Sequence, residues 1–97
     1  MTVIWSPRAE LDVLEIGDRI ADDNIVAAIA WVEKIRARVD AVARMPESGR
    51  VVPEFGAAHI REVFVGAYRI VYCPIPGGVH VLAVFEGSMQ MPRLDDE

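Results

Sequence analysis

Residues 3–7 read Val3-Ile4-Trp5-Ser6-Pro7, and this stretch sets how the chain begins to fold. Its three apolar residues favour a strand, its serine can cap a helix, and the first helical position tolerates a proline. A strand that leads directly into a helix is therefore expected. Apolar residues recur at helical spacing over residues 8–21, which predicts an amphipathic first helix.

A second helix is expected after a short turn. Asp22-Asp23-Asn24 interrupts the first helix and offers side chains that can cap the next one. Apolar residues at helical spacing then predict a helix over residues 25–44. Two helices joined by so short a turn must lie antiparallel, so they form a hairpin with a broad apolar surface.

The second half of the chain is typical of a β-sheet. Residues 45–56 contain two prolines and two glycines, which predicts an ordered loop. Apolar segments follow at residues 60–65, 68–74 and 79–86, separated by glycine-containing turns. This pattern predicts a three-stranded antiparallel meander made of two hairpins.

The order of these elements defines the fold class. An N-terminal strand, an antiparallel two-helix hairpin and a three-stranded antiparallel meander make an α+β fold with one helical layer against one sheet. Neither half could bury a core alone, so we expect residues 1–97 to form a single domain. Residues 88–97 end in three acidic residues and are expected to be a flexible tail.

The chain carries more apolar residues than a soluble domain usually does, at 53% of the sequence. A sheet covered on one face should alternate apolar and polar residues, yet residues 69–73 and 79–85 are apolar on both faces. Two helices can cover only one face. We therefore expect a partner protein to close the other face.

Composition disfavours several kinds of function. The net charge is −5, whereas a general nucleic-acid-binding protein needs basic surface for its phosphate contacts. Cys73 is the single cysteine, and His59 and His80 are separated by strand-like sequence, so no metal site is expected. A chain of this length has no room for a cofactor domain, so no cofactor is expected. No secretion signal or membrane span is visible, and a cytoplasmic protein is expected.

Several strings, in this order, resemble the RelE/ParE toxin superfamily. They are Trp5-Ser6-Pro7-Arg8-Ala9, Pro46-Glu47-Ser48-Gly49-Arg50, Val52-Pro53-Glu54, Ile60-Arg61-Glu62-Val63, Tyr68-Arg69-Ile70-Val71-Tyr72 and Val84-Phe85-Glu86-Gly87. The last string resembles the ParE branch. The resemblance implies a toxin of a type II toxin-antitoxin pair, neutralised by a cognate antitoxin whose C-terminal segment wraps the toxin. ParE-like members poison DNA gyrase, whereas RelE-like members cut mRNA on the ribosome.

The residues favour the gyrase branch. No lysine follows Val51, although RelE-like chemistry draws on lysines and arginines to handle the phosphate. The glycine-X-arginine step that often ends the family's late strand reads Gly87-Ser88-Met89 here. Our leading hypothesis is therefore a ParE-like gyrase inhibitor without catalytic residues of its own. The alternatives are a ribosome-dependent mRNA interferase that uses Arg61, Arg69 and Tyr68, and a protein detoxified through Met89 that still binds an antitoxin.

Two sets of contact residues follow from this hypothesis. The target-binding residues are expected to be Arg61, Arg69, Glu86 and Met89. The antitoxin-binding residues are expected to be Leu11, Leu14 and Ile29 on the helices, and Val71, Leu82 and Val84 on the sheet. For the arginines of the paired strands, the structural alternative is a surface ion pair of little energetic value. Arg50 is expected to pin its loop through hydrogen bonds to carbonyl groups.

Overall fold

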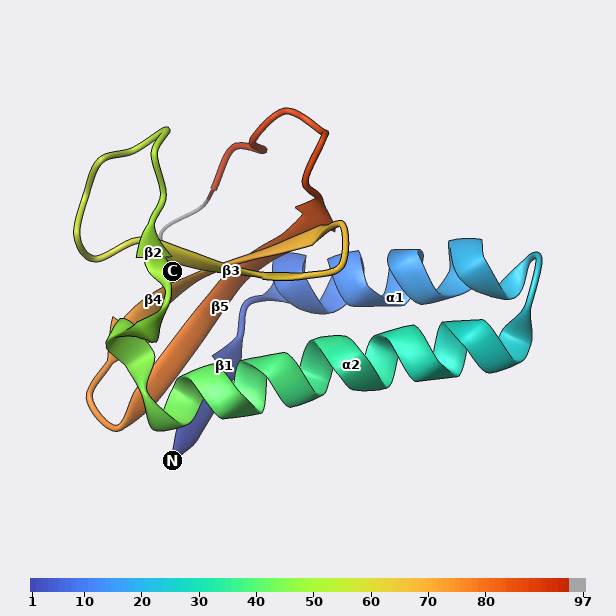
Figure 1. Ribbon diagram of the computed structural model, residues 1–97, viewed down its shortest axis with the longest axis horizontal. Coiled ribbons are helices and arrows are strands. Elements are labelled where there is room, and N and C mark those ends of the chain that lie inside the picture. Colours follow the sequence, from blue (N-terminus) through green and yellow to red (C-terminus); the bar gives the residue numbers. More distant parts are fainter. Residues whose placement is uncertain (95–97) are drawn as a thin grey trace.

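The computed structural model describes residues 1–94, and its element order matches the predicted α+β fold (Figure 1). The elements are β1 (Thr2–Trp5), α1 (Pro7–Ala21), α2 (Ile25–Arg44), a 3₁₀ turn η1 (Pro46–Ser48), β2 (Arg50–Val51), β3 (Arg61–Val65), β4 (Tyr68–Ile75) and β5 (Gly78–Glu86). The two-residue strand β2 was not predicted, because two residues are too few to show an alternating pattern.

The helix starts follow the predicted local chemistry. The Ser6 side chain accepts a hydrogen bond from the Ala9 N–H group at 3.0 Å, and the Asn24 side chain accepts one from the Ala27 N–H group at 3.0 Å. Each side chain thereby satisfies an N–H group that has no partner inside its helix. The two helices run antiparallel as a long hairpin beside the sheet, as predicted (Figure 1).

The sheet has five strands in the order β1-β5-β4-β3-β2. The predicted meander forms its antiparallel part, and β1 joins it by pairing in parallel with β5. This parallel pairing requires Gly78, because a Cβ atom there would lie 1.7 Å from the Thr2 carbonyl oxygen. The first strand therefore pairs with the last one, a contact that no local sequence pattern indicates.

A bulge in β5 fastens α1 to the sheet. The register between β4 and β5 shifts at Val71 and Tyr72, and such an irregularity leaves backbone groups without ladder partners. The Ser6 hydroxyl donates a hydrogen bond to the Leu82 carbonyl at 3.0 Å, and the Val84 N–H group donates one to the Asp12 carboxylate at 2.9 Å. Two side chains of the helical layer thus complete the hydrogen bonding of the strand.

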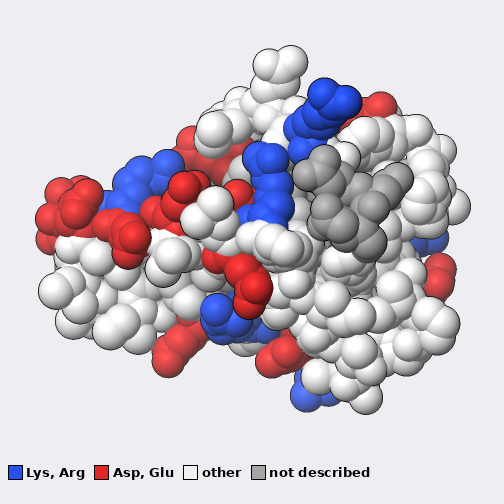
Figure 2. All heavy atoms as spheres, turned by 180° about the vertical axis from the view of Figure 1, so that it is seen from behind, with Lys and Arg blue, Asp and Glu red and all other residues white. Residues whose placement is uncertain are grey.

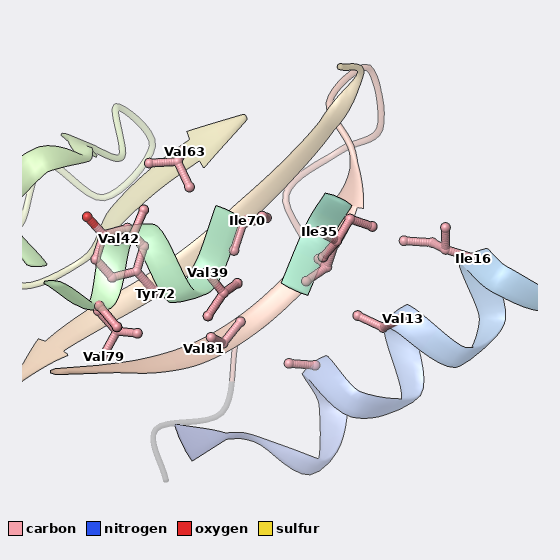
Figure 3. Packing of buried hydrophobic residues seen from close by; sticks show 13 residues of the cluster. Val13, Ile16, Ile35, Val39, Val42, Val63, Ile70, Tyr72, Val79 and Val81 are labelled. Carbon is pink, nitrogen blue, oxygen red and sulfur yellow. The ribbon is translucent and has the colours of Figure 1, made fainter. Parts of the chain in front are cut away.

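The main core lies between the helices and the sheet. Figure 3 shows side chains from α1 and α2 pointing toward β4 and β5. The largest buried members of this core include Ile35, Val39, Ile70, Tyr72 and Val81. Burying such side chains removes apolar surface from water and is the main force that holds the two layers together.

The second face of the sheet is covered by the chain itself, which corrects the prediction that a partner closes it. Val52, from the loop after β2, is fully buried against the sheet. Ile60 from the same loop and Met91 and Leu94 from the C-terminal segment pack on the same cluster. The prediction failed because these covering residues lie in stretches whose sequence indicates a loop and a tail.

The structure describes only part of the predicted tail, residues 88–97. Residues 88–94 run back toward the sheet, whereas residues 95–97 lie outside the described part of the chain. Within residues 1–94, neither helix has the combination of length and apolar character that crossing a membrane requires.

Candidate functional site

Several large apolar side chains are exposed on the helical hairpin. Leu11 and Leu14 on α1 are 53% and 60% exposed, and Ile29 on α2 is 56% exposed. Ile25 and Val26, at the start of α2, are exposed as well. The three predicted antitoxin-contact residues on the helices are therefore open to solvent, and exposed apolar side chains gathered on one pair of helices are typical of an interaction site.

Two adjoining hollows of about 320 and 400 Å³ follow the seam between α1 and α2. They share Gly17, Asp18, Val32 and Arg36, so they form one continuous groove. Gly17 keeps the two helices close at this point, because a Cβ atom there would lie 3.2 Å from a methyl group of Val32. We call this feature the hairpin groove and define it by the residues that line the two hollows.

The border of the hairpin groove is acidic. Glu10 and Asp18 line it from α1, and Glu33 lines it from α2. Residues 7–24 hold six acidic and two basic residues, so this stretch carries −4 of the net charge of −5. Figure 2 shows acidic side chains gathered at the free end of the hairpin. The negative charge of the protein is therefore concentrated beside the exposed apolar patch.

A second cluster of polar side chains lies on the face of the sheet away from the helices. Glu62 on β3 is fully buried and accepts hydrogen bonds from Arg69 Nε at 2.9 Å and from Arg50 Nε at 2.5 Å. Arg69 on β4 also binds both carboxylate oxygens of Glu54 at 3.0 and 3.1 Å. The hydrogen bonds from Arg69 lower the pKa of the Glu54 carboxyl and raise the pKa of the guanidinium itself.

This cluster fixes a loop to the sheet. Glu54 belongs to the loop that brings Val52 and Ile60 onto the second face, and its bidentate pair with Arg69 holds that loop in place. Arg69 is only 6% exposed. The expected surface ion pair is thus a buried one, and the Arg69 side chain is not open to a target in this arrangement.

Arg61 also makes structural contacts. Its Nη1 donates hydrogen bonds to the carbonyl oxygens of Glu47 and Gly49 at 3.2 and 2.9 Å. The Tyr72 hydroxyl fastens the same segment, since it donates to the Pro46 carbonyl at 2.8 Å and accepts from the Gly49 N–H group at 2.9 Å. Arg61 therefore pins the loop in the way that was expected of Arg50, whereas Arg50 pairs with the Glu62 carboxylate.

The three residues of the ribonuclease alternative do not meet. Arg61 and Arg69 point to opposite faces of the sheet, because Arg61 lies opposite Tyr72 of the helix-side core while Arg69 belongs to the second face. Tyr68 lies at the other end of the β3–β4 hairpin from Arg61 and packs edge-on against Trp31, with ring centroids 5.5 Å apart. A substrate phosphate cannot contact all three side chains in this arrangement.

Two of the predicted target-contact residues remain exposed, and both lie at the end of β5. Glu86 is the last residue of the strand, and Met89 is 55% exposed in the turn that follows. The Met89 N–H group donates a hydrogen bond to the Glu86 carbonyl at 3.0 Å, which closes the turn. These two side chains therefore share one accessible corner of the molecule.

The three predicted antitoxin-contact residues on the sheet are buried, and the prediction for them is corrected. Val71 and Leu82 lie beneath the loop and the C-terminal segment that cover the second face, while Val84 faces the helices. None is more than 4% exposed. Among residues 1–94, no group of three histidine, cysteine, aspartate or glutamate side chains is placed to hold a metal ion.

Known proteins share both the sequence pattern and the fold. Residues 3–91 match the family described as "ParE toxin of type II toxin-antitoxin system, parDE". A relative from Caulobacter vibrioides, "Toxin RelE2", is 32% identical over 83 residues, which cover 84% of this chain and 90% of the relative. The solved structure titled "Chromosomal ParDE TA system from P. aeruginosa" has the same fold, with a TM-score of 0.72 at 16% identity over 89% of this chain and 95% of that one.

These matches show that the protein is a toxin of a type II toxin-antitoxin system. Within this class, the chain belongs to the ParE toxin family, because the family match spans nearly all of its length.

Proposed function

We propose that this toxin inhibits DNA gyrase in the cytoplasm and that a cognate antitoxin neutralises it. The observation that carries the choice of target is the position of Arg61, Arg69 and Tyr68, which are separated and engaged in structural contacts. Cleavage of RNA needs an acid, a base and cations that converge on one phosphate. A toxin that acts by binding needs only an accessible surface, and Glu86 with Met89 supplies one.

Gyrase assays test this proposal directly. Purified toxin is added to gyrase with relaxed plasmid, and separately to translating ribosomes with a labelled mRNA. Loss of supercoiling together with accumulation of cleaved plasmid is expected, with the mRNA left intact. Unchanged gyrase activity combined with cleaved mRNA would overturn the proposal in favour of the ribonuclease alternative.

Variants of the exposed corner test the contact residues. Replacing Glu86 and Met89 by alanine should reduce gyrase inhibition without loss of folding, because neither side chain is buried. Replacing the exposed Asp40 by alanine is the matched control. If the wild type affects neither gyrase nor ribosomes and leaves growth normal, the detoxified alternative applies, and toxicity of the Met89→Arg variant would identify the cause.

We propose the hairpin groove as the antitoxin site. The support is its exposed apolar side chains, which fit the apolar face of an amphipathic helix. The chain is co-expressed with its cognate antitoxin, and the complex is purified through a tag on the antitoxin. Leu14→Glu and Ile29→Glu should abolish recovery of the toxin, while Ile4→Glu, at an exposed apolar residue of β1, should not. Equal recovery of all three variants would place the antitoxin elsewhere.

A further inference from the structure

The carboxylates on and beside the hairpin groove form no ion pair within the described part of the chain. Among residues 1–94, Glu10, Asp18 and Glu33, which line the groove, and Glu15, which lies outside its lining, take part in no ion pair within 4.0 Å, although five such pairs form elsewhere. All four residues are exposed. Their charges are therefore free to interact with a molecule that lies in the groove.

These carboxylates surround the exposed apolar side chains. Glu10 and Asp18 are one helical turn from Leu14 on either side, and Glu15 is one turn from Leu11, so each carboxylate shares a helix face with an exposed leucine. Glu33 has the same relation to Ile29 on α2. A helix that buries its apolar face against the leucines and isoleucines must bring its flanking positions next to the carboxylates.

One cation, Arg36, lines the hairpin groove, and Lys34 lies nearby on the same helix. The Arg36 guanidinium lies over the Trp5 ring at 5.2 Å, and the Lys34 ammonium lies over the Trp31 ring at 4.8 Å. These contacts hold the positive charges against aromatic faces. The three lining carboxylates, Glu10, Asp18 and Glu33, still outnumber the single lining cation, Arg36, so the lining of the groove carries a net negative charge.

We propose that the hairpin groove selects an amphipathic helix whose apolar face is bordered by arginine or lysine side chains. The groove is lined from Glu10 to Ala21 on α1 and from Ile25 to Arg36 on α2, a length of about 17 Å that matches a helix of roughly twelve residues. This inference rests on the proposed antitoxin role of the groove and specifies the charge of its occupant. Opposite charges across the border add affinity and exclude helices with acidic flanks.

Two synthetic peptides test the selection without the antitoxin. They share one set of leucines at helical spacing and a hydrocarbon staple that keeps both helical, but one carries lysine and the other glutamate at the flanking positions. Binding to the full chain is measured by fluorescence anisotropy. The lysine peptide should bind about tenfold more tightly at low salt, because several exposed pairs each contribute a modest factor. Half-molar salt should remove most of this difference, because it screens exposed charges.

Protein variants locate the effect. The triple variant Glu10→Gln, Asp18→Asn, Glu33→Gln should bind both peptides equally, and Leu14→Asp should bind neither. The control variant Asp40→Asn, Glu47→Gln, Glu86→Gln removes the same number of charges from positions outside the groove lining and should keep the tenfold preference. Thermal melts confirm that each variant is folded, as expected because all of the neutralised residues are exposed.

Three results would overturn the proposal. They are equal binding of the two peptides to the wild type, a preference that persists in the triple variant, and binding of neither peptide. Equal binding that Leu14→Asp abolishes would leave the groove as an apolar docking site, so the proposed antitoxin role would stand while the charge selection failed. Loss of the antitoxin complex in the co-expression experiment is scored separately and does not depend on the peptides.

Discussion

Replacing Glu62 by glutamine removes a negative charge from a fully buried side chain while changing its shape little. The carboxylate accepts hydrogen bonds from Arg69 Nε and Nη2 and from Arg50 Nε. A glutamine keeps one acceptor oxygen but turns an amide group toward donors that it cannot satisfy. Arg69, whose side chain is 8% exposed, then retains Glu54 as its only anionic partner.

The expected loss of stability follows from this burial. Breaking a buried ion pair by removing one partner costs about 3–5 kcal/mol, because the remaining charge stays buried without compensation. The pair between Arg69 and the partly exposed Glu54 persists and compensates part of the remaining charge, so we expect Glu62→Gln to lower the free energy of unfolding by about 3 kcal/mol, at the lower end of this range. Small domains are stable by only about 5–15 kcal/mol in total, so the change should be large in a denaturation curve.

Urea denaturation followed by circular dichroism measures the change. Glu47→Gln provides the control, because Glu47 pairs with Arg61 at 3.4 Å but is 79% exposed. An exposed pair of this kind contributes about 0–1 kcal/mol. If Glu62→Gln destabilises the protein no more than Glu47→Gln does, then the buried cluster is not what holds the loop on the sheet, and the reasoning is refuted.

Three further outcomes are expected. Tyr72→Phe should lower the free energy of unfolding by about 1–3 kcal/mol, because it leaves the buried Gly49 N–H group without its acceptor; an unchanged urea midpoint would contradict this role. Burial raises the pKa of Asp12 above 3.8, so its protonated form favours folding, and that contribution is lost as the pH rises through the pKa of the folded protein. As the pH rises through the pKa of folded Asp12, the free energy of unfolding of Asp12→Asn should therefore increase relative to that of the wild type. A difference that is independent of pH would argue against a raised pKa. Joint replacement of Met91 and Leu94 by serine should uncover the second face of the sheet, measured as increased binding of a hydrophobic dye, whereas dye binding at the wild-type level would show that the C-terminal segment does not shield it.

The sequence was sufficient to predict the helices and most strands, because their signals are local. Ser6 and Asn24 cap the two helices as their positions indicate, and the apolar spacing marks the helix faces. The parallel pairing of β1 with β5 could not be predicted from local signals, because it joins segments from the two ends of the chain. The backbone contact between Thr2 and Gly78 depends on that pairing.

The buried ion cluster could have been predicted in part. A two-residue turn at Gly66 and Ala67 sets a register that places Glu62 and Arg69 on one face of the β3–β4 hairpin. Their burial could not be read from this register, because it depends on a loop and a C-terminal segment that fold back over the sheet. Apolar residues in those two segments, such as Val52 and Leu94, were the available sign of this cover.

The distribution of charge changes what the acidic composition means for function. Residues 7–24 carry −4 of the net −5, so the remainder of the chain is close to neutral, with nine acidic and eight basic residues. The excess of acidic residues therefore lies on α1 and the turn that follows it, because α2 holds two acidic and four basic residues. The net charge says little about what the corner formed by Glu86 and Met89 can bind. It bears on the partner of the hairpin, because exposed carboxylates beside an apolar groove attract a basic amphipathic segment and repel an acidic one. The proposed antitoxin site would thus account for the acidic residues of α1, and the choice of target has to be argued from the residues of the sheet.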